Sequence, residues 1–422
     1  MYKDTNNSYI NIKKLSVMKK LLLFVCAAVT AISANAQTTV IGKSFTVEQL
    51  RENTVNKVLA TTNTSETINK KNVIAAAPEL NKLSGNYVEA SYNEIYDCSE
   101  ATVTTTGENV TFSISGGSAS FTGTYDATSG LITVKEQNAG TYTDTRGTFT
   151  FKFVGLQEDA ATGKINIVNQ ATFTASDEGE ISCNQIGYAI GITDFVPAEG
   201  SDYTKEDMVG AWWTLSWETR FMPINGVQSC TANLFGEGYK KHTFPTSIED
   251  YEYSVNVYGF CGLGCISLDI DDNLNVSISA GQPIYKNPNV KTEEDIATYG
   301  PYYYIVACNI ENGYLIPDYD KVVPGKLSGN TITLSEYFLL RSKNDAEDKG
   351  YSLGAVADKG STITLNTGNF LAAGTTGIEE IGVTREEKIK NTKTYNLMGQ
   401  QVNRATAKGL LIRDGKKYIN KK

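Results

Sequence analysis

The clearest pattern in this chain is an alternation of apolar and polar residues over short runs. It is strict over 110–114, 149–153 and 164–168. Alternation puts the apolar side chains on one face of a strand and the polar ones on the other. Turn-forming pairs, such as Gly116-Gly117 and Ser129-Gly130, separate the runs. Many short strands with frequent turns predict an all-β fold, an antiparallel barrel or sandwich with one buried and one wet face.

The order of landmarks in the first half of the body recurs in the second half. The paired ranges are 83–87 with 208–212, 110–116 with 253–259, 126–137 with 272–282, 163–167 with 329–334, and 186–191 with 349–354. A shared order of landmarks is the signature of an internal repeat. We therefore predict two related antiparallel β-barrel or sandwich units in tandem, over 83–196 and 206–370. The second copy is longer, chiefly through an insertion between Thr219 and Asp250.

The N-terminal residues have the pattern of a secretory signal peptide. A basic pair, Lys19-Lys20, precedes the apolar run 21–29, and Ala34-Asn35-Ala36 offers a cleavage site. The apolar run is too short to span a bilayer. We take 1–36 as leader and signal peptide, with the true start at Met18. Lipidation at Cys26 is the alternative, but its bulky neighbour Val25 argues against it.

The segment 37–80 does not show the alternation of the body. Residues 45–59 have a loose helical period, with Thr46 as a possible N-cap. A Thr- and Asn-rich stretch follows and runs to Pro78. We predict a short helix and a linker over 37–80, and no domain.

The C-terminal residues predict a small β module. Strand-forming residues surround a break at Gly399-Gln400, and the run 410–412 turns at Asp414-Gly415 into Tyr418-Ile419. Asp-Gly between apolar runs is a strong hairpin signal, because glycine supplies the positive φ of the turn. The alternative is that this hairpin is the last one of the preceding β unit.

This C-terminal pattern resembles the sorting signal of the type IX secretion system of Bacteroidota, although it is shorter than a complete sorting domain. The residues that carry the resemblance are Tyr395, Asn396, Leu397, Gly399, Gln400, Val402, Gly409, Ile412, Gly415 and Lys416, within 378–422. The resemblance implies recognition by the type IX secretion machinery. It implies export through the inner membrane and then a cell-surface or extracellular location.

A second, less specific resemblance concerns the body. Gly85-Asn86-Tyr87 and Gly210-Ala211-Trp212 open the two predicted units. This Gly-x-aromatic opening resembles the first strand of lipocalin-like (calycin) barrels, where the aromatic residue plugs the closed end. The body is also similar to β-rich repeats of uncharacterised surface proteins of Bacteroidota. Neither resemblance implies an activity.

Charge is unevenly spread along the chain. The formal net charge is −9, residues 1–36 carry +4 and residues 378–422 carry +6, which leaves −19 on the body between them. Nucleic acids and anionic membranes are bound by clustered Lys and Arg, so an acidic body argues against both as partners. It is compatible with neutral glycans or divalent cations. We expect no membrane-spanning segment after the signal peptide.

Cysteine and histidine limit the metal chemistry that we expect. Six of the seven cysteines follow the signal peptide, and an even number in an exported chain predicts disulfides. The candidates are Cys98, Cys183, Cys230, Cys261, Cys265 and Cys308. The alternative, a zinc half-site at Cys261-x-x-x-Cys265, lacks a second closely spaced pair. The single histidine, His242, cannot supply a multi-histidine site, and we expect it on the surface. We expect no cofactor and no metal.

Two sets of acidic residues could carry chemistry. Residues 269–275 look like a calcium loop but lack the glycine and the final glutamate of an EF-hand, so a tight turn is the alternative. Glycoside hydrolysis needs two facing carboxylates. The candidates are Glu94, Asp97, Glu100, Glu249, Asp250 and Glu252. The alternative is that these carboxylates are solvated loop charges.

Aromatic residues are the strongest hint of a ligand site. Trp212, Trp213 and Trp217 lie on one predicted strand, where alternation puts Trp213 and Trp217 on one face and Trp212 on the other. The run Tyr302, Tyr303 and Tyr304 has the same property. Exposed rings would stack on sugars, whereas cross-strand packing is the alternative. The leading hypothesis is a non-enzymatic ligand-binding or adhesin-like protein, for a glycan or a host/matrix ligand. A secreted polysaccharide hydrolase and a structural surface component are the alternatives.

Overall fold

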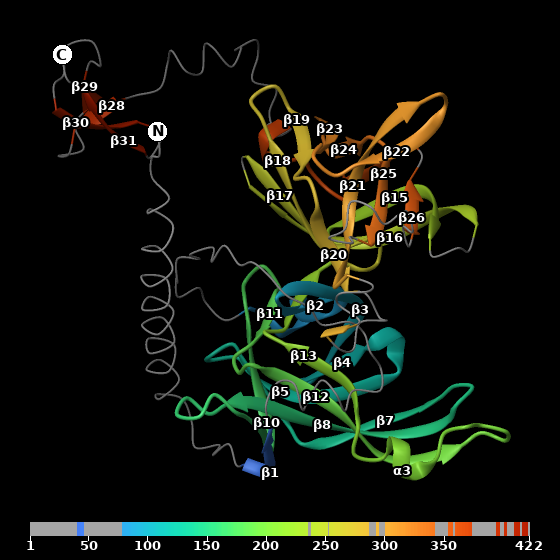
Figure 1. Ribbon diagram of the computed structural model, residues 1–422. Coiled ribbons are helices and arrows are strands. Elements are labelled where there is room, and N and C mark those ends of the chain that lie inside the picture. Colours follow the sequence, from blue (N-terminus) through green and yellow to red (C-terminus); the bar gives the residue numbers. More distant parts are fainter. Residues whose placement is uncertain are drawn as a thin grey trace, which may run out of the picture.

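The computed structural model describes residues 40–45, 78–234, 238–251, 253–286, 293–294, 300–341, 353–357 and 359–373, and the strands of a C-terminal sheet at 394–396, 401–402, 409–413 and 416–420. Nearly all regular structure in these residues is antiparallel β, which confirms the predicted fold class. Among them, no helix is long and apolar enough to cross a membrane. Figure 1 shows two β-rich bodies, one following the other along the chain.

The first body is built on a closed ring of eight antiparallel strands. In ring order these are β2 (Gly85–Asn93), β3 (Ile95–Thr106), β4 (Asn109–Ile114), β5 (Ala119–Asp126), β6 (Leu131–Lys135), β10 (Gln170–Ala175), β11 (Ile181–Cys183) and β14 (Arg220–Pro223), which pairs again with β2. Closure leaves the ring without an unpaired edge.

Four ring strands continue, past a bend, into a second sheet that we call the first side sheet. β6 continues into β7 (Gln137–Thr143) and β11 into β12 (Gly187–Pro197), whereas β9 (Ile165–Val168) leads into β10 and β13 (Trp212–Trp217) leads into β14. The central strand is β8 (Gly147–Glu158), which pairs with β7, β9 and β12. β13 pairs with β12. The bends therefore join the ring and the side sheet into one body.

The core of the first body lies between the ring and the side sheet. Phe112 and Phe121 come from the ring, Phe151 and Phe153 from the side sheet, and all four are buried. The rings of Phe121 and Phe153 lie 4.5 Å apart across this core. Alternation in these strands directs the aromatic residues inward, as the sequence predicted. The interior is filled with side chains, so the first body is packed rather than hollow.

The second body repeats this arrangement strand for strand. Its ring comprises β15 (Gly226–Leu234), β16 (Tyr239–Asp250), β17 (Ser254–Phe260), β18 (Gly264–Ile270), β19 (Asn275–Ile278), β23 (Val323–Ser328), β24 (Thr331–Leu334) and β27 (Ser361–Leu365). Its side sheet comprises β20 (Gln282–Lys286), β21 (Tyr302–Glu311), β22 (Tyr314–Asp318), β25 (Tyr337–Arg341) and β26 (Leu353–Ala357). The pairing order matches the first body, with one added pairing of β15 with β26. The predicted internal duplication is therefore present as a duplicated topology.

One pair of residues fixes the register of the duplication. Gln137 accepts a hydrogen bond from the Thr122 N–H at 2.9 Å and donates to its carbonyl at 2.7 Å. Gln282 does the same with Ser267, at 2.8 and 3.2 Å. The landmark 126–137 with 272–282 thus matched equivalent strands. The landmark 110–116 with 253–259 also matched equivalent strands, β4 and β17, with the register two residues out.

The other three landmarks were wrong, and so were the boundaries of the units. Residues 208–212 lead into β13, the strand that pairs with β12 of the first body, so Gly210-Ala211-Trp212 does not open the second unit. β9 is equivalent to β22 and not to β24, and β12 is equivalent to β25 and not to β26. The first body extends to β14, and the second begins at Gly226. The Gly-x-aromatic motif by itself does not identify the first strand of a unit, because the motif is common in strands.

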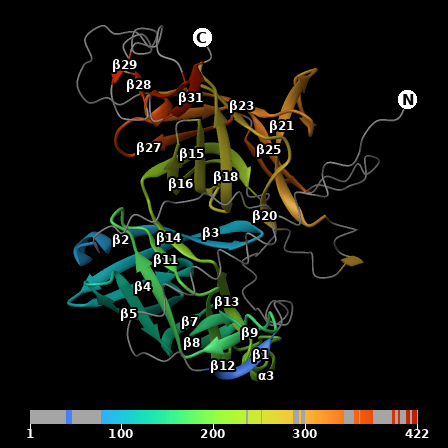
Figure 2. The ribbon, with the colours of Figure 1, turned by 90° about the vertical axis from the view of Figure 1, so that its left-hand side faces the viewer.

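The two bodies pack through one outer wall of each ring. Val88, Cys98 and Met222 of the first body form a buried cluster with Tyr258 of the second. A single backbone pairing, Asp97 with Gly264, joins β3 to β18 across this contact. Figures 1 and 2, which are turned by 90°, both show the second body seated against the side of the first that carries β2 and β3.

The remaining elements lie at the ends and between the strands. β1 (Val40–Phe45) adds to the side sheet by pairing with β9, so the segment predicted as helix and linker begins with a strand. The described residues also include a four-residue helix, α3 (Lys205–Met208), which is capped by Thr204, and the 3-10 turns η2 (Leu80–Leu83), η3 (Ser115–Gly117) and η4 (Leu371–Ala373).

The C-terminal strands form a sheet of their own. The order is β29 (Gln401–Val402), β28 (Thr394–Asn396), β30 (Gly409–Arg413), β31 (Lys416–Asn420). Arg413 pairs with Lys416, so the hairpin predicted at Asp414-Gly415 is confirmed. Within the described residues this sheet pairs with neither body. The signal peptide, the predicted helix beyond Phe45, and the sorting residues Leu397, Gly399, Gln400 and Gly415 lie outside the described residues.

Candidate functional site

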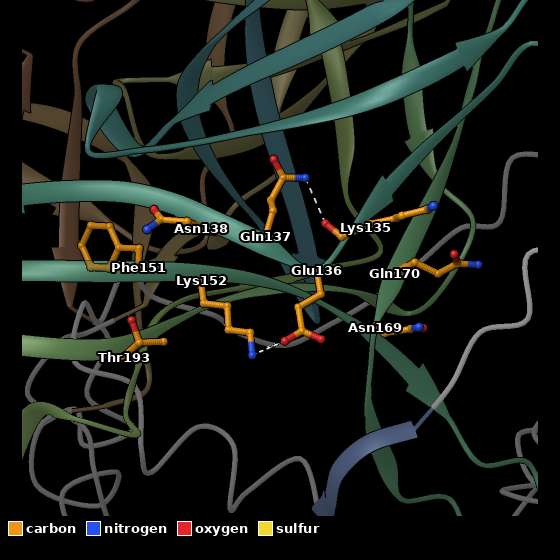
Figure 3. Close-up of a pocket in the computed structure, with 9 residues that line it drawn as sticks. All are labelled: Lys135, Glu136, Gln137, Asn138, Phe151, Lys152, Asn169, Gln170 and Thr193. Carbon is orange, nitrogen blue, oxygen red and sulfur yellow. Dashed lines mark hydrogen bonds and ion pairs between the residues drawn. The ribbon is translucent and has the colours of Figure 1, made fainter.

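An open depression with a volume of about 600 Å³ lies on the first body. It lies where β6 bends into β7 and β9 bends into β10, beside β8 and β12 (Figure 3). The lining residues are Lys135, Glu136, Gln137, Asn138, Phe151, Lys152, Asn169, Gln170 and Thr193. A volume of this size lies within the range of small-molecule and oligosaccharide sites.

The bends that form the depression are held by hydrogen bonds. The Glu136 N–H donates to the Asn169 carbonyl at 2.7 Å, which ties the two bends together. The Gln137 amide donates to the Lys135 carbonyl at 2.9 Å, in addition to its two bonds with Thr122. These contacts fix the backbone below the depression. A site built on a fixed backbone is preorganised for a ligand.

The lining is polar, and its charges nearly cancel. Lys152 pairs with Glu136, and Lys135 at the rim is exposed. The other polar side chains are four amides and the exposed hydroxyl of Thr193. Amides and hydroxyls both donate and accept hydrogen bonds, as the vicinal hydroxyls of a sugar do. The one aromatic lining residue, Phe151, is 1% exposed and belongs to the core.

A second, much smaller cavity lies inside the first body and holds two carboxylates. Its volume is about 20 Å³, which is room for about one water molecule. The lining residues are Glu89, Ser91, Asp97, Ser99, Ser115, Thr214, Leu215 and Ser216. We call it the chamber. A sugar ring cannot enter it, so these two carboxylates do not offer the open cleft that a glycosidase needs.

Glu89 is the central residue of the chamber. It is 4% exposed and accepts hydrogen bonds from Tyr188, from Ser216 at 2.6 Å and from Ser99 at 3.3 Å. Burial raises the pKa of Glu89, and these three hydrogen bonds only partly offset that effect. Burial, and then the charge of Glu89, raise the pKa of Asp97 well above its ordinary value. The two carboxyls therefore cannot both ionise at low cost.

The second body has an equivalent cluster with different chemistry. The paired registers place Gln228 where the first body has Glu89, and Tyr337 where it has Tyr188. The Gln228 amide donates to the Tyr337 hydroxyl at 3.3 Å, and that hydroxyl bonds Ser361 at 2.7 Å. The duplication thus retained the tyrosine and the hydrogen bonds but replaced the buried acid by an amide.

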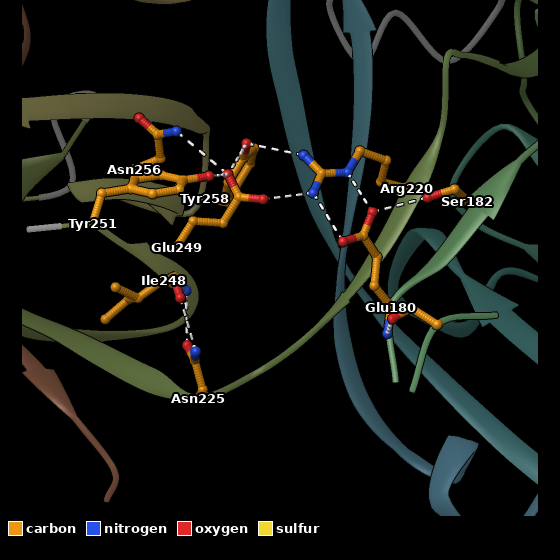
Figure 4. Close-up of polar contacts among 10 residues, drawn as sticks. Glu180, Ser182, Arg220, Asn225, Ile248, Glu249, Tyr251, Asn256 and Tyr258 are labelled. Carbon is orange, nitrogen blue, oxygen red and sulfur yellow. Dashed lines mark hydrogen bonds and ion pairs between the residues drawn. The ribbon is translucent and has the colours of Figure 1, made fainter. Parts of the chain in front are cut away.

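A third polar cluster joins the two bodies (Figure 4). Arg220 of β14 donates to Glu180 of the first body at 2.7 and 3.0 Å and to Glu249 of the second at 2.6 Å. The Tyr258 hydroxyl donates to Glu249 at 3.0 Å. Burial raises the pKa of Glu249, but the Arg220 charge outweighs it and holds that pKa below its ordinary value. Arg220 therefore links the bodies rather than serving a reaction.

The tryptophans do not form the exposed surface that the sequence allowed. Trp213 and Trp217 are each 3% exposed, and Trp212 is half-buried. The register shifts where Ile190 faces Thr214 and Gly191 faces Trp212, so Trp213 is a bulge. A bulge breaks alternation, and it sends Trp213 into the main core while Trp212 and Trp217 join a cluster on the other face of the side sheet. Cross-strand packing was the correct alternative.

The tyrosine run also belongs to packing. Tyr303 is 7% exposed, and Tyr302 and Tyr304 are half-buried. Tyr302 and Tyr304 contact each other edge to face, with ring centroids 5.9 Å apart. No tyrosine of this run lines the depression or the chamber.

The six cysteines predicted to form disulfides are free thiols in the described residues. Cys98, Cys230 and Cys261 are buried, and Cys183, Cys265 and Cys308 are half-buried. Where the structure describes the chain, no three His, Cys, Asp or Glu side chains are close enough together to hold a metal ion.

His242 and the acidic turn have local structural roles. His242 lies half-buried on β16, with its ring stacked on Phe244 and Nε2 3.2 Å from the Ala232 carbonyl oxygen. The Asp271 carboxylate accepts from the N–H groups of Asn273 and Asn275, at 2.8 Å each. Lys326 donates to the Asn273 carbonyl at 2.7 Å, which holds a cationic side chain of the protein at this turn. The tight-turn alternative is the one that this geometry fits.

Sequence reasoning missed both cavities. Glu89 carried a usable signal, because it follows Tyr87 by two positions and so points inward with that buried residue. The depression carried none, because its residues come from separate strands that meet only in the folded chain.

No protein-family model, curated protein or solved structure matches this chain.

Proposed function

We propose that this protein is an exported, non-enzymatic ligand-binding protein whose depression at the β6–β7 and β9–β10 bends takes a hydroxyl-rich carbohydrate. The observation that carries the proposal is the depression itself, with its volume of about 600 Å³ and its lining of amides, a hydroxyl and a Lys–Glu pair. Such groups bind sugar hydroxyls through paired donors and acceptors. Lys135 leaves the site with one excess positive charge, which suits a sugar acid as well as a neutral sugar.

The binding test uses a steric block and a matched control. Thr193 is exposed and lines the depression, so Thr193→Trp should fill it without disturbing the core. Thr141→Trp places the same bulk at an exposed position of β7 outside the lining. On a glycan array with neutral and uronic-acid polysaccharides, we expect wild type and Thr141→Trp to bind the same glycans. Thr193→Trp should lose at least tenfold in affinity by calorimetry.

Three outcomes of this test contradict the carbohydrate proposal. The first is that the wild-type protein is folded but binds no glycan on the array. The second is equal binding by Thr193→Trp. The third is release of reducing sugar from any bound polysaccharide, which would support the hydrolase alternative. Specific adhesion to another copy or to a matrix without glycan binding would support the structural alternative.

Export by the type IX secretion machinery is a separate proposal, supported by the signal-peptide pattern and by the C-terminal segment 378–422. The described part of that segment pairs only with itself, as a detachable signal should. Deleting 394–422 should retain the protein in the periplasm. Grafting 378–422 onto an unrelated periplasmic reporter should carry the reporter to the surface. Normal surface display of the variant that lacks 394–422 would contradict the proposal that this segment is a sorting signal.

A further inference from the structure

Two cysteine side chains meet inside the second body. Cys230 lies on β15, and Cys261 directly follows β17. Both are buried, at 5% and 4% exposure, and both belong to the core of this body. The two side chains converge on one polar group, the Tyr337 hydroxyl and its partner Ser361.

The surrounding contacts hold the two thiols toward one point. The Cys261 N–H donates to the Gln228 side-chain oxygen at 2.5 Å, and the Gln228 amide donates to Cys261 Sγ at 3.4 Å. Cys230 is paired with Ser361, whose hydroxyl bonds that of Tyr337. The Tyr337 hydroxyl lies 3.6 Å from Cys261 Sγ. The polar groups therefore enclose the sulfur pair and fix its orientation.

The first body shows what these positions hold when no cross-link is possible. The registers place Ser91 where the second body has Cys230. Ser115 directly follows β4 with φ 50°, and Cys261 directly follows the equivalent strand with φ 55°, so these two are equivalent as well. Ser91 and Ser115 both line the chamber. The fold accepts small hydroxyls there, so packing alone does not require the cysteine pair.

The other thiols are less well placed. Asp97 pairs with Gly264 in antiparallel register, which sets Cys98 opposite Leu263 and leaves Cys265 on the diagonal. Diagonal neighbours are about 7–8 Å apart, whereas a disulfide needs Cα atoms within about 7 Å. Cys183 packs against the core of the first body and Cys308 against a cluster of the second.

We propose that Cys230 and Cys261 form a disulfide in the exported protein and that the other four cysteines remain thiols. This inference rests on the proposed export, because disulfides persist in oxidising compartments. The oxidant is a disulfide-bearing thiol oxidoreductase or glutathione disulfide. The Cys261 thiolate attacks one sulfur of that disulfide and releases its first thiolate. Cys230 then loses its proton and attacks the Cys261 sulfur, which releases the second.

The electron balance of this exchange is defined. The two cysteines lose two protons and two electrons, and the oxidant's disulfide becomes two thiols. The balance is the same if Cys230 attacks first. Both thiols are buried in the closed ring, so the exchange takes place during folding, before the ring closes.

Peptide mapping without reduction tests the pairing. Recombinant protein refolded with glutathione disulfide and protein recovered from the native host are both alkylated, digested and analysed by mass spectrometry. We expect one linked peptide pair, 230 with 261, and alkylation of the other four cysteines. Closing the 230–261 loop should lower the unfolding equilibrium constant by on the order of several hundredfold. Reduction should reverse that gain.

Variants and the two protein sources separate the possible failures. Cys230→Ser and Cys261→Ser restore the residues of the first body, so they should fold and be insensitive to reductant. Cys98→Ser should keep the linked pair. A 98–265 link, or alkylation of both Cys230 and Cys261 in oxidised protein, would overturn the pairing. If only the refolded protein carries the link and the native protein is reduced inside the cell, export fails while the pairing stands.

Discussion

The buried acid Glu89 gives the sharpest stability prediction. Glu89→Gln keeps the shape of the side chain and removes its charge. The amide oxygen can still accept from Tyr188 and Ser216, and the amide nitrogen can donate to the Ser99 hydroxyl. Gln228 occupies the equivalent position of the second body, so the fold already tolerates this residue there. Glu89→Ala instead removes every acceptor.

The magnitudes follow from burial and hydrogen bonding. Glu89→Ala leaves the buried hydroxyls of Tyr188 and Ser216 without their acceptor, and each unsatisfied buried group costs about 1–3 kcal/mol. We expect Glu89→Ala to lower the free energy of unfolding by about 2–5 kcal/mol. Glu89→Gln should be at least as stable as wild type at pH 7. Each unit by which folding raises the pKa of a carboxyl group costs ~1.4 kcal/mol of stability at a pH where both states are ionised.

The sign of the pH dependence is fixed by the direction of the shift. The folded protein holds the Glu89 proton more tightly than the unfolded chain, since burial raises that pKa. Stability from this group is therefore complete below the ordinary carboxyl pKa of about 4.3 and falls as pH rises toward the folded value. The advantage of Glu89→Gln over wild type should grow from pH 4 to pH 8.

Urea denaturation followed by tryptophan fluorescence measures this directly. All three tryptophans lie on β13 of the first body, so the signal reports the body that contains Glu89. Two results would refute the reasoning. One is a Glu89→Gln protein that is less stable than wild type by more than about 2 kcal/mol at pH 7. The other is a difference between the two proteins that does not change with pH.

Other substitutions test the contacts between and within the bodies. Arg220→Gln should cost about 1–3 kcal/mol by leaving the half-buried carboxylates of Glu180 and Glu249 without their cationic partner. Limited proteolysis should then cut between the bodies, and an unchanged digest would contradict the linking role. Trp213→Ala should cost about 3–5 kcal/mol in thermal denaturation yet leave glycan binding per folded molecule unchanged, and selective loss of binding would restore the stacking hypothesis. Gln137→Ala should weaken ligand binding, whereas the equivalent Gln282→Ala should not; equal effects would place the ligand elsewhere.

The all-β fold and its duplication could be predicted because both follow from patterns over a few consecutive residues. Alternation in β4 and β8 follows from the burial of one face, and the turn and glutamine around 126–137 and 272–282 recur because they hold the same bend. The unit boundary could not be read in this way. β14 belongs to the first ring only because it pairs with β2, more than 120 residues earlier in the chain, and no local pattern encodes that partner.

The candidate site failed for a related reason. The predicted aromatic face on 212–217 assumed unbroken alternation, but the bulge at Trp213 is set by pairing with β12. The depression is assembled from strands that meet only after the bends form. Glu89 is the exception, since its inward position follows from the alternation in β2. The inward position of an acid in an alternating run can therefore be predicted from the sequence, whereas the exposure of the aromatic residues could not.

Hydrogen–deuterium exchange with a bound oligosaccharide locates the binding site on the chain. The ligand identified on the array is added to the full mature chain, and protection is mapped by peptide. We expect slower exchange in peptides that contain 135–138, 169–170 and 193, with no change in the second body. Protection confined to β13 or to the second body, with those peptides unaffected, would contradict this location of the site.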